Sequence, residues 1–192
     1  MPKVVDHEER RNSIARAAML EIAENGIEDL RLKDVAARAG WTTGVLTHYF
    51  KSKEDLLSEA LKVTFREVVG EAVAESKDDR HDDYELLRRW LPCSPGRLVV
   101  SKAWIAFIGS AQFSSANRAL FEDYYRLTIL EGRRRLANVP LAMDLDVAAD
   151  MVLAFFEGLC ARVVMEPDAW PAERQEALLE TFFKRVLQGT DG

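Results

Sequence analysis

Apolar residues recur three or four positions apart along almost the whole chain, with polar residues between them. This spacing predicts amphipathic helices, and no segment shows the strict alternation of a half-buried strand. Polar, glycine and proline positions interrupt the pattern and set the limits of each helix. We expect helices over residues 7–25, 32–39, 43–49, 53–75, 84–91, 97–113, 117–138, 146–165 and 172–187. The predicted fold class is therefore all-α.

Two short helices separated by a tight break lie within residues 32–57. Gly40 ends the first, because glycine takes a positive φ without steric cost. Thr42 is well placed to cap the second. Such a pair makes a helix-turn-helix, whose second helix lies in the major groove of DNA. An ordinary corner between two helices needs the same glycine and cap, so the spacing alone leaves both interpretations open.

The polar positions of the second short helix favour DNA binding. No carboxylate occurs between Gly40 and Lys53, and Lys51 and Lys53 follow the helix, where a phosphate backbone would lie. The predicted DNA-binding residues are Arg31, Thr42, Thr43, Gly44, Thr47, His48, Tyr49 and Lys53. Three arginines of the first helix, Arg10, Arg11 and Arg16, either face the DNA backbone or form a solvated basic end.

Residues 32–57 resemble the DNA-binding signature of the TetR family of bacterial transcriptional regulators. The likeness lies in DVAARAG, then TTGVLTHYF, then KSKEDL. It implies a homodimeric, ligand-responsive repressor of a double-stranded DNA operator. Two positions depart from the family pattern: Trp41 replaces a small aliphatic residue in the turn, and Thr47 replaces a tyrosine that many members carry. The resemblance therefore does not predict how Trp41 packs in the turn, nor whether Thr47 makes the phosphate contact expected of the tyrosine.

Charge and pattern divide the chain into an N-terminal head and a larger body. The chain has a net charge of −6, but residues 1–53 hold nine basic and eight acidic residues, so the acidic excess lies in the remainder. Only charges within about a Debye length of the phosphates affect DNA binding strongly. We expect a three-helix DNA-binding head over residues 1–53 and a helical ligand-binding and dimerisation body over residues 54–192.

Other function classes find little support in the sequence. No apolar run is long enough for a membrane helix or a signal peptide, which predicts a cytoplasmic protein. Cys93 and Cys160 form no metal or disulfide motif, and both are expected to be buried thiols. His7, His48 and His81 lie far apart, and no Gly-rich phosphate loop occurs. We therefore expect no catalytic residues, metal or cofactor, with a small helical enzyme or a ligand-independent DNA binder as alternatives.

Aromatic residues on the body's helices form either plain core or a ligand pocket. The pocket candidates are Trp90, Trp104, Phe107, Tyr124, Tyr125 and Phe155. KAWIAF at residues 102–107 and GLCAR at residues 158–162 resemble the choline-responsive branch of the TetR family, which regulates glycine betaine synthesis. That resemblance implies a quaternary ammonium inducer against Trp104. Nearby acids that could neutralise it are Glu122, Asp123 and Glu157, although a solvated position is the simpler expectation for most.

The last two predicted helices carry more apolar surface than one interior face needs. The surplus predicts a four-helix interface between two copies of the chain, which the TetR resemblance also implies. A fully buried pair of helices in a monomer is the alternative. The predicted dimerisation residues are Val152, Phe156, Leu159, Val163, Leu179, Phe182, Phe183 and Val186.

Overall fold

The structure, a computed structural model, describes residues 3–74, 83–111 and 115–190, and all regular elements in these ranges are helical. The all-α prediction is confirmed. The helices are α1 (Lys3–Asn25), α2 (Leu32–Ala39), α3 (Thr43–Tyr49), α4 (Lys53–Ala74), α5 (Asp83–Arg88), α6 (Pro95–Ala111), α7 (Ser115–Leu136), α8 (Leu145–Met165) and α9 (Ala172–Thr181). A 3₁₀ turn, η1 (Pro167–Ala169), precedes α9, and a π-helical turn, η2 (Phe182–Leu187), follows it.

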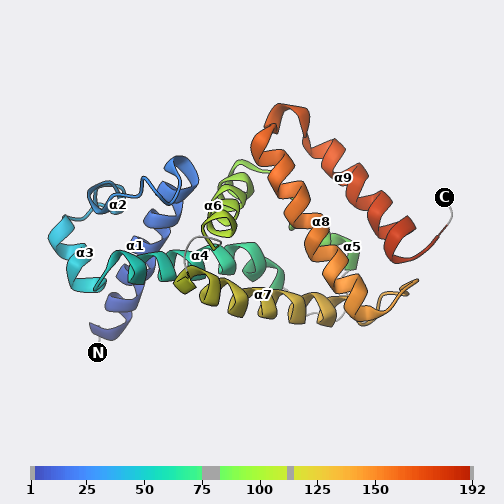
Figure 1. Cartoon of the computed structure of the whole chain (residues 1–192), viewed down its shortest axis with the longest axis horizontal. Coiled ribbons are helices and arrows are strands. Elements are labelled where there is room, and N and C mark those ends of the chain that lie inside the picture. Colours follow the sequence, from blue (N-terminus) through green and yellow to red (C-terminus); the bar gives the residue numbers. More distant parts are fainter. Residues whose placement is uncertain (1–2, 75–82, 112–114, 191–192) are drawn as a thin grey trace.

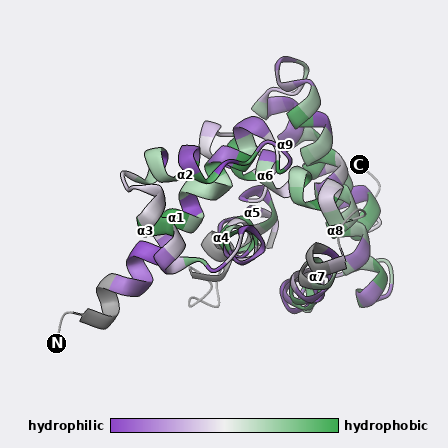
Figure 2. Cartoon of the chain, turned by 60° about the vertical axis from the view of Figure 1, so that its left-hand side comes forward, coloured by the Kyte–Doolittle hydropathy of each residue, from purple (hydrophilic) through white to green (hydrophobic). Residues whose placement is uncertain are grey.

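The helices form a head at one end and a body at the other (Figure 1). Helices α1, α2 and α3 make the head, α4 runs from it into the body, and α6 lies between the two ends. Helices α8 and α9 lie at the end of the molecule far from α3. In Figure 2, hydrophilic and hydrophobic positions alternate along the same helices, as amphipathic segments require. No helix in the described ranges is long and apolar enough to cross a bilayer.

Local signals explain most helix limits. Gly40 has φ +75° and lets the amide of Trp41 donate to the carbonyl of Ala36, which ends α2. The Ser52 hydroxyl accepts from the amide of Asp55 at 3.1 Å and so caps α4. Thr42 occupies the position before α3, but its side chain makes no capping hydrogen bond among the described residues.

Helix α6 begins two residues earlier than predicted. Pro95 was expected to interrupt the chain, but it is the first residue of the helix, where proline's fixed φ and missing amide hydrogen are tolerated. The Ser94 hydroxyl accepts from the amide of Arg97 at 3.2 Å and caps this start. His81 in the gap between the predicted helices over 53–75 and 84–91, and the end of the predicted helix at Phe113, lie outside the described residues.

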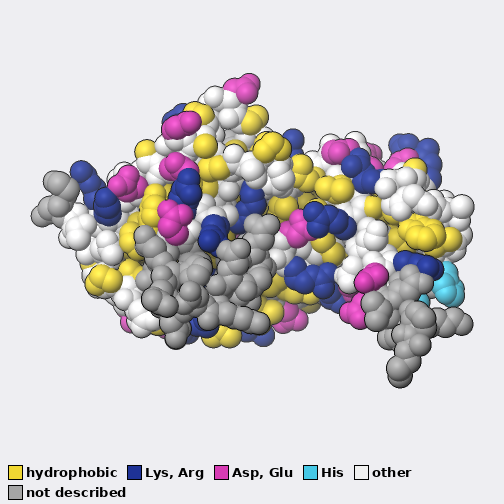
Figure 3. All heavy atoms as spheres, turned by 180° about the vertical axis from the view of Figure 1, so that it is seen from behind, with side chains coloured by type: hydrophobic (Ala, Val, Ile, Leu, Met, Phe, Trp, Pro, Cys, Tyr) yellow, Lys and Arg dark blue, Asp and Glu magenta, His cyan; other side chains and the backbone are white. Residues whose placement is uncertain are grey.

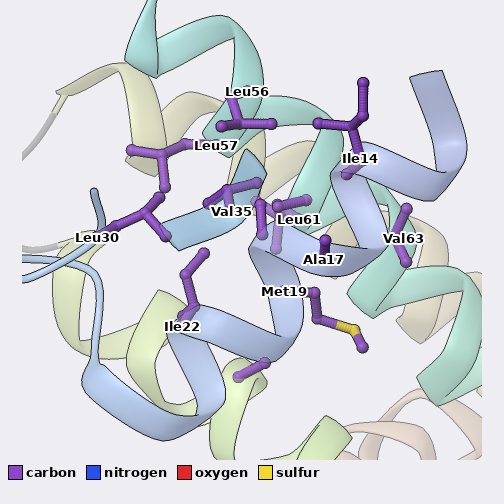
Figure 4. Close-up of a cluster of buried hydrophobic side chains, with 14 of the residues drawn as sticks. Ile14, Ala17, Met19, Ile22, Leu30, Val35, Leu56, Leu57, Leu61 and Val63 are labelled. Carbon is purple, nitrogen blue, oxygen red and sulfur yellow. The ribbon is translucent and has the colours of Figure 1, made fainter. Parts of the chain in front are cut away.

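One hydrophobic core joins the head to α6. Figure 4 shows its part from α1, α2 and α4, where Ile14, Val35 and Leu61 point toward one another. The same cluster of buried side chains continues to Trp104 and Phe107 of α6. Packing therefore does not stop after residue 53, where the sequence analysis placed the boundary between the head and the body.

A second hydrophobic core fills the body and contains most of the residues predicted to form the dimer. Seven of them are buried within the single chain: Val152, Phe156, Leu159, Val163, Leu179, Phe182 and Phe183. Val186 is half-buried and packs against the same core. Four of these eight residues lie on α8 and the other four on α9 and η2, and all of them pack in or against this core. Their own chain covers these side chains, so the single chain gives no support for a role of these residues at a dimer interface, and that role stays a prediction.

Candidate functional site

Helix α3 presents its polar side to solvent and its apolar side to the head. Leu46 is 1% exposed and packs into the core, which fixes the rotation of the helix. Of the predicted DNA-binding residues, six are exposed: Arg31, Thr42, Thr43, Gly44, Thr47 and His48. Tyr49 and Lys53 are half-buried. These polar side chains are therefore accessible or partly accessible to solvent, and their contact with DNA stays a prediction.

Aromatic rings continue this surface onto α1. The His7 ring lies 4.6 Å from that of Tyr49 and 6.5 Å from that of His48, measured between centroids. Figure 3 shows histidine side chains at the head end of the molecule, beside basic side chains. His7 was not among the predicted DNA-binding residues. Residues 7 and 48 are far apart in the sequence, and only the folding of α1 against α3 brings their rings together.

The three arginines of α1 have different surroundings. Arg11 donates from Nη1 to the carbonyl of Tyr49 at 2.5 Å, so it holds the end of α3. Arg16 forms an ion pair with Glu67 of α4. Arg10 lies over the ring of Trp41, 5.4 Å from its centroid. Trp41 is 38% exposed, so it forms a partly open surface of the turn.

A pocket opens in the body between α4, α6, α7 and α8. Its empty space amounts to about 550 Å³, including the part open to solvent. The lining residues are Val68, Trp90, Arg97, Val100, Ser101, Trp104, Thr128, Leu153, Phe156, Glu157 and Cys160. Helices α6 and α8 each contribute four of the lining residues, beginning at Arg97 and at Leu153. In each helix the four lie at positions i, i+3, i+4 and i+7, which is one helical face.

The pocket combines aromatic rings with an acid. Trp90, Trp104 and Phe156 line it, and the rings of Trp90 and Phe156 meet edge to face at 5.3 Å. Glu157 brings a carboxylate whose Oε1 is buried and finds no hydrogen-bond partner among the described residues. Burial raises the pKa of Glu157, because a charged group loses hydration there. Such a carboxylate favours a cationic ligand, because a positive charge beside it would compensate for the hydration that the carboxylate lost on burial.

Two of the six predicted ligand-binding residues, Trp90 and Trp104, line this pocket. Phe107 does not, and is 2% exposed in the core that joins α6 to the head. Phe155 also lies elsewhere, stacked on Phe182 with 4.3 Å between ring centroids. Its neighbour Phe156 lines the pocket instead, since successive residues on a helix point about 100° apart.

The two predicted tyrosines pack on other rings rather than in this lining. Tyr124 lies 4.8 Å from the ring of Phe65, which joins α7 to α4. Tyr125 lies 5.7 Å from the ring of Phe121 on its own helix. Both are half-buried on α7 and neither is among the lining residues of this pocket, so their contact with a ligand stays a prediction.

Polar residues of the pocket were largely missed from the sequence. Arg97, Ser101 and Thr128 line it, and of the three acids considered, Glu157 is the one that the structure places there. The repeated spacing on α6 and α8, each with one charged position, was the signal available. Cys160 is buried as expected, and burial raises its pKa. Cys93 is exposed, contrary to prediction, because it lies in the bend before α6.

Comparison with known proteins now identifies the family. Residues 14–60 match the bacterial regulatory proteins of the tetR family, and residues 84–188 match the C-terminal domain of BetI-type transcriptional repressors. The regulator PksA of Bacillus subtilis (strain 168) is 26% identical, with 87% of this chain and 84% of that protein covered. BetI of Yersinia pestis (strain Pestoides F) is 27% identical, with 93% and 92% covered.

Solved structures share the fold. A transcriptional regulator from Rhodococcus sp. Rha1 has a TM-score of 0.81 at 22% identity, covering 95% of this chain and 98% of its own. A regulator from Saccharomonospora viridis, solved in complex with choline, has a TM-score of 0.75 at 23% identity, covering 94% and 98%. Both resemblances read from the sequence are confirmed by the family matches. The chain belongs to the TetR family of bacterial regulatory proteins and carries a BetI-type repressor domain in its C-terminal part.

Proposed function

We propose that the protein is a cytoplasmic, non-enzymatic repressor whose operator binding is relieved by a quaternary ammonium compound, with choline as the first candidate. The buried, unpartnered carboxylate oxygen of Glu157 among aromatic rings carries this proposal. A related fold with choline bound and the BetI-type domain support the same ligand class. The relatives are transcriptional regulators, which supports a regulatory rather than a catalytic role.

The pocket offers a quaternary ammonium ion both charge and aromatic faces. The ion loses hydration on entry, a cost that must be offset inside the protein. A cation over an aromatic face contributes about 0.5–2 kcal/mol, and Trp90, Trp104 and Phe156 provide three rings. The carboxylate of Glu157 adds the charge compensation that the rings alone lack. Ser101 and Thr128 bring hydroxyl groups into the same lining, where a ligand hydroxyl could bind.

The accessible side of α3 and its flanking residues bind DNA in this proposal, with the eight residues predicted from the sequence as the contacts. The pocket affects that surface through α4, because Val68 of this helix lines the pocket while Lys53 begins it beside α3. A ligand that favours another position of α4 would move α3 relative to its copy in a dimer. Two recognition helices must keep a fixed separation to reach successive major grooves, so operator affinity falls.

The dimer proposal rests on a different face of α8 from the one predicted. Along this helix, small or apolar residues recur with alternating spacings of four and three, as in a helix–helix seam. These residues are Val147, Met151, Ala154, Gly158, Ala161 and Met165, and all are exposed or half-buried. Leu178 of α9 is 39% exposed as well. Pairing α8 and α9 of two chains would cover these side chains in a four-helix bundle.

Calorimetric titration with choline tests the ligand assignment. We expect heat of binding for the wild-type protein and at least about tenfold weaker binding for Glu157→Gln, equivalent to about 1.4 kcal/mol. Glu122→Gln is the matched control, since Glu122 is an exposed acid of α7. A DNA fragment selected from random sequence by the protein should be released by choline. Absence of both heat and release at millimolar choline would remove the choline assignment and leave the family assignment intact.

A further inference from the structure

The side chain of Arg97 connects the pocket to α4 by donating hydrogen bonds to main-chain carbonyl oxygens. It lies in the first turn of α6 and lines the pocket. Its Nη1 donates to the carbonyl oxygen of Glu67 in α4 at 2.7 Å, and its Nη2 donates to the carbonyl oxygen of Arg89 after α5. The planar guanidinium fixes the two donors relative to each other, which a lysine could not do. One side chain thus holds α4, α6 and the end of α5 in register.

Glu67 carries this connection on to the head. While its carbonyl accepts from Arg97, its carboxylate forms an ion pair with Arg16 of α1. The next residue, Val68, lines the pocket. Glu67 therefore has its main chain bound by the body and its side chain bound by the DNA-binding head. A shift of α4 at this position changes both contacts together.

A cationic ligand has a direct reason to disturb Arg97. The ligand and the guanidinium would carry the same charge in one cavity, and like charges repel most strongly where water is scarce. Repulsion favours an arrangement in which Arg97 releases or shifts the carbonyl of Glu67. A surface groove of about 660 Å³, including open solvent, is lined on the other side by Arg16, Glu67 and Arg97. These side chains can therefore change position without opening the hydrophobic core.

We propose that Arg97 is the positioning residue that transmits occupation of the pocket to the head, along the path from Arg97 through Glu67 to Arg16. The inference rests on the proposed function for the identity of the ligand, but the path itself consists of contacts within the chain. It predicts that Arg97 and Arg16, which belong to different helices, α6 and α1, act on operator binding as one unit.

The first arm of the test uses the operator fragment without ligand. Operator affinity is measured for wild type, Arg97→Met, Arg16→Gln and the double variant. We expect the effects of the single substitutions to be non-additive by more than about twofold, as for residues in one network. Thermal melts check that each variant is folded, and Arg97→Lys, which keeps the charge but lacks the fork, provides a milder second variant. The proposal is overturned if the effect of Arg16→Gln adds to that of Arg97→Met and also to that of Arg97→Lys.

The second arm adds choline. Allosteric couplings are typically about 5–150-fold, and we expect choline to lower wild-type operator affinity within this range. The ratio of operator affinity without choline to operator affinity with choline should fall to less than about twofold in Arg97→Met, while choline still binds. Arg126→Met, an exposed arginine of α7, is the control and should keep the wild-type ratio. An unchanged ratio in Arg97→Met overturns the path and leaves the ligand assignment standing. If choline fails to bind wild type but the first arm is non-additive, the ligand assignment fails and the path stands.

Discussion

Arg11 and Asp55 form an ion pair, with 2.8 Å between Nη2 and Oδ1, that joins α1 to the first turn of α4. Partial burial raises the pKa of Asp55, but the Lys51 amide and the Arg11 guanidinium outweigh this effect and hold that pKa below its usual value. Because Arg11 also donates to the carbonyl of Tyr49, a single guanidinium fixes both the end of α3 and the start of α4. The orientation of the DNA-binding helix therefore depends on this residue.

Replacing Arg11 with alanine should destabilise the head and weaken operator binding. We expect a loss of about 1–2 kcal/mol in the free energy of unfolding, since the pair is only partly buried. Asp55 has a depressed pKa, so its contribution to stability is present above about pH 4 and lost as the pH falls through the folded-state pKa. Denaturant unfolding at pH 7 and pH 3 should show a smaller acid loss for the variant. An equal loss in both proteins would contradict the assigned pair.

Substitutions on α3 and at the start of α4 should separate specific from general DNA contacts. Thr43→Ala and His48→Ala should each cost about 1–3 kcal/mol on the operator and little on random DNA, if they contact base edges. Lys53→Ala should weaken binding to both and reduce the slope of log affinity against log salt by about one. Fluorescence anisotropy on two DNA fragments at several salt concentrations measures these effects. Wild-type operator affinity in the first two variants would exclude α3 as the reading helix.

Glu157→Gln should change stability with pH in a defined direction. Since the pKa of Glu157 is raised in the folded protein, the folded state holds the proton more tightly than the unfolded state. The contribution of Glu157 to stability is therefore most favourable at low pH and declines as the pH rises from about 4.3 through the folded-state pKa. The glutamine variant lacks this decline, so it should melt at a higher temperature than wild type at pH 8 and match it at pH 4. Choline binding to wild type should weaken on acidification, because protonation removes the negative charge.

A charge on the proposed seam of α8 should separate the two chains. Ala154 is exposed and lies in the middle of the seam, so Ala154→Glu should give a folded monomer by sedimentation at micromolar concentration. Ala119→Glu makes the same change at an exposed position of α7 and should remain dimeric. Operator affinity should fall in the first variant only, because a dimer binds two half-sites. A wild-type protein that sediments as a monomer would rule out the dimer.

The helices could be predicted because their signals are local. Gly40 ends α2 through its own backbone conformation, as predicted, and the Ser52 hydroxyl caps the start of α4. Pro95 misled the prediction, since proline interrupts a helix interior but suits a first turn. Which interpretation applies depends on the preceding cap, here Ser94, and not on the proline itself.

Which face of a helix points where could not be read so directly. Phe155 and Phe156 are adjacent and chemically alike, yet only Phe156 lines the pocket. On α8, the strongly apolar residues such as Leu159 are covered by the chain itself, whereas the outward seam is marked by less conspicuous residues such as Ala154 and Gly158. Tertiary packing decides which of two apolar faces of a helix is covered by the rest of the chain, and the apolar periodicity of the sequence does not distinguish them.

Trp104 lies in the wall of the pocket and also in the hydrophobic core that contains Leu46 of α3. The DNA-binding part and the sensing part are therefore not interchangeable modules. Grafting residues 1–53 onto the body of another regulator would leave apolar side chains of α6 without their native neighbours. We therefore expect a functional chimera to need matched residues at positions 103, 104 and 107 as well.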